Sequence, residues 1–184
     1  MTFRDGSATL GTATLAGGTA SFPTSALSAG SHSITAVYGG DANFLGSTSG
    51  VLTQGVSYRF TGFLSPLTTA GTYSSPTFSG SLNLTRGVPI KWQLQDGSGK
   101  YLSDLNTTQL LQAVVNVGCP GLPGTQTILL YSPTSGAKGG STFRSGSNQF
   151  IFNWDTSSGT SPGCYTLVLQ LADGSQRATI VQLN

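Results

Sequence analysis

His32 is the only histidine of the chain, so a hydrolase of the Ser-His-Asp type would have to use it as its general base. It lies in the stretch SHSITAVY, which alternates like a strand, and it shares parity with Ile34 and Tyr38. The sequence contains no G-x-S-x-G nucleophile elbow. The pattern therefore favours His32 as a packing residue at the start of a strand.

A second candidate for nucleophilic chemistry is the S-x-x-K pattern of Ser135 and Lys138. In Ser-Lys acyl transfer the lysine must lie one helical turn from the serine, so that its amine can take the hydroxyl proton. Here the pattern lies in SPTSGAKGGS, and such a glycine-rich stretch does not favour a helix. A small hydrolase of esters or lactones, using a serine with His32 or Lys138, stays open as an alternative function.

The acidic residues offer little for glycosidase or metal chemistry. All six are aspartates, and they are scattered, which argues against a paired-carboxylate site. Asp41 and Asn43 in GGDANF could supply oxygen ligands to calcium, although a turn stabilised by their side chains is the commoner use. Asp155 follows a predicted strand and is expected to cap a turn. One histidine and two distant cysteines do not fit zinc, and we expect no cofactor.

The two cysteines, Cys119 and Cys164, are too far apart in sequence for a CxxC metal or redox site. An even cysteine count in a chain rich in Gly, Ser and Thr fits an oxidising compartment. We predict a disulfide between them, which ties the stretch before LPGTQTILLY to the start of a terminal hairpin. Two buried free thiols are the alternative.

Composition indicates an all-β protein. Charged residues make up only 8% and the net charge is +2, with no run of Lys or Arg, so a nucleic-acid partner is not expected. No apolar stretch approaches the length of a membrane-spanning helix. Short alternating stretches separated by Gly-rich turns predict the strands of a β-sandwich.

The second half of the chain shows the clearest alternation. Strands are predicted in VPIKWQLQD and QFIFNWD, with a terminal hairpin around Asp173-Gly174-Ser175. TQLLQAVVNV is compatible with a strand or a helix, and we predict a strand because the apolar stripe of a helix would be less regular. The side chains expected to face inward are Ile90, Trp92, Leu94, Leu111, Ala113, Val115, Val117, Phe150, Phe152 and Trp154. If Phe60, Phe63, Trp92, Phe150, Phe152, Trp154 and Tyr165 instead formed an exposed row, they would suit a glycan-binding module, which is the third function considered.

The first half of the chain contains four short motifs: Phe3-x-Asp5-Gly6, Leu10-Gly11-Thr12-Ala13, Leu27-x-x-Gly30-x-His32, and Ala36-Val37-Tyr38 followed by Gly40-Asp41-x-Asn43-Phe44. With these motifs, residues 1–53 resemble the bacterial immunoglobulin-like repeats of large secreted and surface proteins. It implies a domain that lacks its first strands, because such a sandwich has about seven strands in about 100 residues. We therefore expect a second copy to complete the sheet in a homodimer, or residues 57–184 to cover it within one chain.

The second half of the chain contains the motifs Pro89-x-Lys91-Trp92, Trp154-Asp155-Thr156 and Gly163-x-Tyr165-Thr166-Leu167. With these motifs, residues 57–184 resemble the PxKF-type domain that closes many secreted bacterial proteins, with Trp92 in place of the family's Phe. The family implies an extracellular β-sandwich without a defined catalytic role. Pro89 fits the start of an edge strand, and Lys91 is then expected at the surface or rim and not as a catalytic amine.

Together these patterns predict an all-β chain of two domains, an incomplete immunoglobulin-like β-sandwich at 1–53 and a second β-sandwich at 57–184. The expected function is that of a non-catalytic structural or adhesive module of a secreted or cell-surface bacterial protein, outside the cell. Its expected partners are a second copy and a surface glycan or protein.

Overall fold

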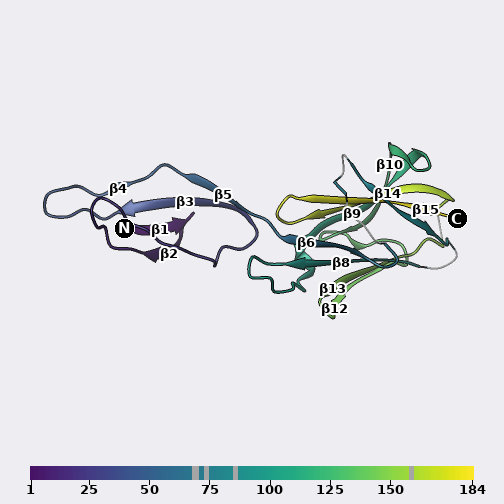
Figure 1. Cartoon of the computed structure of the whole chain (residues 1–184), viewed down its shortest axis with the longest axis horizontal. Coiled ribbons are helices and arrows are strands. Elements are labelled where there is room, and N and C mark those ends of the chain that lie inside the picture. Colours follow the sequence, from purple (N-terminus) through teal and green to yellow (C-terminus); the bar gives the residue numbers. More distant parts are fainter. Residues whose placement is uncertain (68–70, 73–74, 85–86, 158–159) are drawn as a thin grey trace. The chain divides into compact units, whose positions relative to one another are not determined.

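The computed structural model describes residues 1–67, 71–72, 75–84, 87–157 and 160–184. The chain divides into two compact units, Met1–Ser57 (unit 1) and Tyr58–Asn184 (unit 2). Both are built from β-strands, and the described residues contain one short 3-10 helix, Leu105–Thr107 (η1). The all-β fold class predicted from the sequence is confirmed (Figure 1).

Unit 1 is a single antiparallel sheet. Its strands are β1 (Thr2–Asp5), β2 (Ala8–Thr12), β3 (Gly30–Tyr38), β4 (Ser47–Thr48) and β5 (Leu52–Val56). The order is β2-β1-β3, with β4 and β5 both pairing to the free side of β3 (Figure 1). Gly6, with φ of 54°, closes the predicted turn of the β1–β2 hairpin. Strand β5 continues to Val56, so the sheet extends past Thr53, where the sequence predicts its end.

Unit 1 has almost no hydrophobic core. No hydrophobic side chain of the fully described residues 1–57 is buried, and the buried side chain there is that of His32. Apolar packing is limited to contacts such as the stacked rings of Phe3 and Phe22, whose centroids are 5.7 Å apart. A side chain at Gly11 would collide with the Phe22 ring, which explains the glycine after Leu10.

Unit 2 is a sandwich of two sheets (Figure 1). The first has the order β11-β10-β9-β14-β15-β7, from β7 (Thr77–Leu82), β9 (Thr108–Gly118), β10 (Gly121–Ser132), β11 (Gly136–Ala137), β14 (Gly163–Leu171) and β15 (Gln176–Leu183). The second has the order β12-β13-β8-β6, from β6 (Arg59–Leu64), β8 (Val88–Gln95), β12 (Thr142–Gly146) and β13 (Gln149–Trp154). Neighbouring strands are antiparallel except β7 and β15, which are parallel.

The core of unit 2 lies between these sheets. Strand β8 alternates strictly, with Ile90, Trp92 and Leu94 fully buried. Phe150 and Phe152 of β13 are equally buried, and the ring of Phe150 stacks on Trp92 with centroids 5.6 Å apart. The predicted inward faces of these two strands are therefore confirmed.

Two expectations about unit 2 are wrong. Val117 is 77% exposed, because the β9–β10 hairpin runs past the last residue pair of β9 and β14, Val115 and Tyr165. Strand β8 is an interior strand between β13 and β6, not an edge strand. Pro89 is nevertheless accommodated there, because the pairing of β6 with β8 begins only at Lys91.

Candidate functional site

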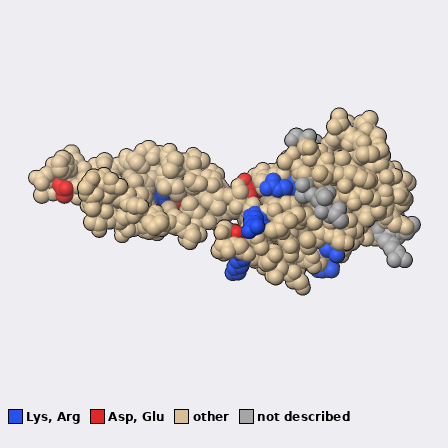
Figure 2. Space-filling model, viewed as in Figure 1, with Lys and Arg blue, Asp and Glu red and all other residues tan. Residues whose placement is uncertain are grey.

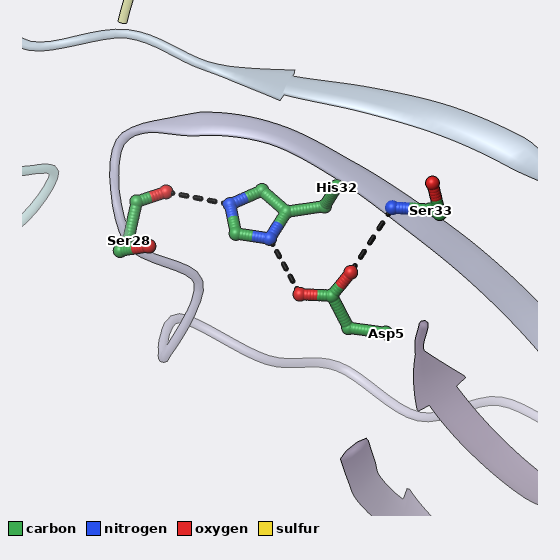
Figure 3. Close-up of polar contacts among 4 residues, drawn as sticks. All are labelled: Asp5, Ser28, His32 and Ser33. Carbon is green, nitrogen blue, oxygen red and sulfur yellow. Dashed lines mark hydrogen bonds and ion pairs between the residues drawn. The ribbon is translucent and has the colours of Figure 1, made fainter. Parts of the chain in front are cut away.

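The candidate site of unit 1 is a polar cluster around His32, at the start of β3 (Figure 3). Nδ1 of His32 lies 2.6 Å from a carboxylate oxygen of Asp5, the last residue of β1, and Nε2 lies 2.8 Å from the carbonyl oxygen of Ser28. The other oxygen of Asp5 accepts the main-chain N–H of Ser33 at 3.0 Å. The His32 side chain thus joins β1, β3 and the segment that leads into β3.

The contact between Asp5 and His32 shifts the pKa values of the two side chains in opposite directions. The hydrogen bond with Asp5, followed by the bond to the Ser28 carbonyl, raises the pKa of His32 above its ordinary value, against a smaller effect of burial. The hydrogen bond from His32 is the main cause that lowers the pKa of Asp5. The arrangement therefore favours the ion pair of a protonated imidazole with a carboxylate.

This geometry does not form a Ser-His-Asp triad. A catalytic histidine needs the nitrogen that does not face the carboxylate to meet a serine hydroxyl. In unit 1 that nitrogen meets the main-chain carbonyl of Ser28, which can only accept. His32 is 9% exposed and packs at the start of β3, as its place on the same predicted strand face as Ile34 and Tyr38 indicates. The sequence did not reveal Asp5 as its partner; the only signal was an acidic residue at the turn of the first hairpin.

Ser135 lies in the tight connection between β10 and β11, Lys138 follows β11, and neither residue lies on a helix. The hydroxyl of Ser135 is 2.7 Å from the hydroxyl of Ser132. Lys138 is exposed, and its main-chain N–H donates to the carbonyl of Leu130 at 2.9 Å. The helical turn that Ser-Lys chemistry requires is not formed here.

The Asp41 side chain shapes the loop that follows β3. One oxygen of Asp41 accepts the main-chain N–H groups of Asn43 and Phe44, at 2.7 and 2.9 Å, and the other accepts the Tyr38 hydroxyl at 2.5 Å. In the described part of the chain, no group of three His, Cys, Asp or Glu side chains is placed to hold a metal ion. The Asp41 side chain stabilises this turn as the sequence favours, whereas Asn43 contributes its main-chain N–H.

Asp155 and Asp173 cap turns in unit 2. Oδ1 of Asp155 accepts the main-chain N–H and the hydroxyl of Ser157, at 2.9 and 2.6 Å, as the sequence predicts for a turn after β13. Asp173 makes the same pair of contacts with Ser175, and its second oxygen accepts the main-chain N–H of Tyr58 at 2.7 Å. That bond fixes the first residue of unit 2 to its last hairpin, and no local pattern in the sequence predicts it.

A disulfide joins Cys119, in the turn between β9 and β10, to Cys164 in β14. The Cα atoms are 5.2 Å apart, within the range for such a bridge. Cys119 is exposed, whereas Cys164 is 4% exposed. The bridge therefore holds the protruding end of the β9–β10 hairpin against the buried start of β14.

The candidate residues on β8 divide between the two faces of the strand. Lys91 points away from the core and is half-buried, between Leu64 of β6 and Ile151 of β13 on the outer face. Trp92 points inward, and its indole N–H has no hydrogen-bond partner among the described residues. Trp154 is also buried and packs edge-on against Tyr165.

The surface offers no row of aromatic side chains from the set considered for glycan binding. Phe63, Trp92, Phe150, Phe152, Trp154 and Tyr165 are buried, and Phe60 is partly buried against the same core. On the face drawn in Figure 2, the described Lys and Arg residues of unit 2 lie apart from one another and do not form a continuous basic patch. These aromatic residues therefore belong to the core, as alternation in strands favours.

Comparison with known proteins gives a match for unit 1. Residues 1–57 match the family model of the bacterial Ig-like domain (group 3). No curated protein matches the chain. Among solved structures, a chimeric titin Z1Z2-Z1Z2 tandem functionalized with a GRGDS peptide from fibronectin aligns over 99% of this chain and 81% of its own, at 10% identity and a TM-score of 0.31. In the described residues, no helix is long and apolar enough to cross a membrane.

Proposed function

We propose that the chain is a non-catalytic structural or adhesive module of a secreted or cell-surface bacterial protein. The observation that carries the proposal is the match of residues 1–57 to the bacterial Ig-like domain. The disulfide of unit 2 supports a location in an oxidising compartment, because such bridges are rare in reducing cytosol. The sandwich core of unit 2, filled by aromatic and aliphatic side chains, suits a load-bearing or spacer domain.

Unit 2 is, in this proposal, a PxKF-like domain. Its Pro89-x-Lys91-Trp92 motif lies on β8, in the middle of one sheet, with Trp92 in the core and Lys91 on the outer face. In this role the motif fixes the packing of the sandwich, and Lys91 does no chemistry. Replacing Lys91 by Met should then leave the free energy of unfolding within about 0.5 kcal/mol, as for most surface positions.

The proposed partner of unit 1 is a second copy of the chain. Both outer strands of its sheet, β2 on one side and β4 with β5 on the other, lack a neighbour within residues 1–57. Leu52 of β5 and Val51 beside it are 62% and 65% exposed. Unpaired strand edges with apolar side chains are templates for pairing with another strand. Size-exclusion chromatography with light scattering should give a dimer, and a monomer at high micromolar concentration would refute this part of the proposal.

The location is tested in bacteria that express the native gene. An antibody against the 184-residue chain should label intact cells or detect the protein in the medium, and external protease should remove the signal from intact cells. A cytoplasmic control protein must survive the same treatment. Detection in the cytoplasmic fraction alone would contradict the proposal.

The absence of catalysis is tested with a panel of ester, lactone and glycoside substrates. The chain should give no turnover above buffer. Turnover that is abolished by His32→Ala or by Ser135→Ala would overturn the non-catalytic assignment and support the hydrolase instead.

A further inference from the structure

We propose that unit 1 contains a proton-dependent latch, in which His32 holds the segment Pro23–Ala29 against β3 only while its imidazole ring carries both protons. The latch is a conformational device and does not depend on the function proposed above. It rests on the kind of atom that faces each ring nitrogen in Figure 3.

Both ring nitrogens of His32 face groups that only accept. Nδ1 is 2.6 Å from the Asp5 carboxylate, and Nε2 is 2.8 Å from the Ser28 carbonyl. A neutral imidazole has one N–H donor and one nitrogen lone pair, so it can satisfy one of these contacts at most. The cation has two N–H donors and satisfies both. The observed contacts therefore assign the doubly protonated ring to His32.

Loss of one proton breaks one of the two contacts. The remaining N–H stays with Asp5, because a hydrogen bond to a carboxylate is stronger than one to a neutral carbonyl. Nε2 then directs its lone pair at the Ser28 oxygen, and the contact becomes repulsive. Among the described residues, the bond between His32 and the Ser28 carbonyl joins the segment Pro23–Ala29 to a strand. The other hydrogen bond of that segment, from Ala26 N–H to the Thr24 hydroxyl, stays within the segment.

Asp5 is the charged group that faces His32. On β1, the neighbouring Arg4 is exposed on the opposite face. On β5, the residue paired with His32 is the neutral Gln54. Neither β2 nor the segment Pro23–Ala29 contains an ionisable side chain.

The remaining ionisable side chains of unit 1 are Tyr38, the last residue of β3, and Asp41, to which the Tyr38 hydroxyl donates a hydrogen bond at the end of β3 far from His32. Asp5 raises the pKa of His32, and His32 lowers the pKa of Asp5. The latch is therefore closed between these two pKa values. It opens as the pH rises through the raised pKa of His32.

NMR titration of the full chain tests the latch, because His32 gives the only histidine signals. The titration should give a pKa above the ordinary value of about 6.5, and below that pKa the ring nitrogen shifts should show both N–H groups. Asp5→Asn should lower this pKa, whereas the matched control Asp41→Asn should leave it unchanged. A pKa at or below 6.5 in the unmodified chain would overturn the proposal.

Hydrogen exchange measures the release of the segment itself. After correction for the intrinsic pH dependence, exchange in Pro23–Ala29 should rise about three- to tenfold across the His32 titration, as expected for loss of one hydrogen bond. His32→Gln, which does not titrate, should abolish this rise. A raised pKa without any change in exchange, or the same rise in His32→Gln, would show that the proton does not hold the segment.

Discussion

Removal of the Cys119–Cys164 bridge should destabilise unit 2 and leave unit 1 unaffected. Both cysteines lie in unit 2, and the bridge joins the protruding end of the β9–β10 hairpin to β14. The suitable variant is Cys119→Ser with Cys164→Ala. Serine is suited to the exposed position, and alanine avoids burying an unpaired hydroxyl at the buried one.

The magnitude follows from the length of chain that the bridge closes. Its cysteines are 45 positions apart in sequence, and closing a loop of that length lowers the entropy of the unfolded chain by an amount equivalent to about 4 kcal/mol. Loss of packing at Cys164 adds a smaller cost, because its side chain is buried. For a urea slope of about 2 kcal/mol per M, the unfolding midpoint should fall by about 2 M.

Tryptophan fluorescence follows this transition selectively. Trp92 and Trp154 are the only tryptophans, and both are buried in the core of unit 2. Reduction of the unmodified chain should shift the midpoint to nearly that of the double variant, whereas reductant should not change the double variant. The His32 signals, which belong to unit 1, should be the same in both proteins.

A loss of less than about 1 kcal/mol in the double variant would refute the reasoning, because an unconstrained loop of this length should cost several times more. A loss that reductant does not reproduce in the unmodified chain would show that the substitutions act through packing and not through the bridge.

Three further substitutions test particular contacts. Trp92→Phe should change the free energy of unfolding by less than about 1 kcal/mol, because losing the unpartnered indole N–H offsets lost packing, whereas Trp92→Ala should cost about 3–5 kcal/mol; equal losses would contradict this. Asp173→Ala should cost unit 2 about 1–3 kcal/mol in urea unfolding, because the Tyr58 N–H loses its acceptor, and a neutral result would show that water replaces it. Gly11→Ala should displace the Phe22 ring and lower the melting temperature of unit 1, which the NMR signals of His32 monitor; an unchanged melting temperature would mean that the ring moves aside without cost.

The inward faces of β8 and β13 could be predicted from sequence, because every second side chain of these two strands is buried. In β8 the alternation of apolar and polar residues agrees with the burial pattern, and in β13 the aromatic side chains of Phe150, Phe152 and Trp154 are the buried ones. The terminal hairpin could also be predicted, since Asp173-Gly174-Ser175 is a local turn signal. These features depend on neighbouring residues only.

Strand order could not be predicted, because it depends on contacts between distant parts of the chain. The parallel pairing of β7 with β15 joins Thr77 to Thr179, and no local pattern encodes it. The interior position of β8 depends on β6 and β13 in the same way. Val117 lies on the face that alternation predicts, yet it is 77% exposed, because β9 runs past its last residue pair with β14, Val115 with Tyr165.

The candidate site was predicted in part. His32 could be assigned to the start of a strand by its parity with Ile34. Its partners could not, because Asp5 reaches it only through the pairing of β1 with β3, which places Asp5 opposite Ile34. A main-chain carbonyl such as that of Ser28 has no signature in sequence at all. The chemistry of a lone histidine therefore depends on atoms that its own segment does not reveal.

The two units are stabilised by different interactions, and this difference explains why His32 matters to unit 1. Unit 2 buries aromatic and aliphatic side chains between two sheets, and it contains no histidine. Unit 1 buries no hydrophobic side chain and instead joins three of its segments through one buried histidine. A hydrophobic core responds weakly to pH, whereas an ion pair is lost when either partner changes charge. As the pH rises through the raised pKa of His32, unit 1 is therefore the unit whose structure should change, whereas the core of unit 2 should not respond.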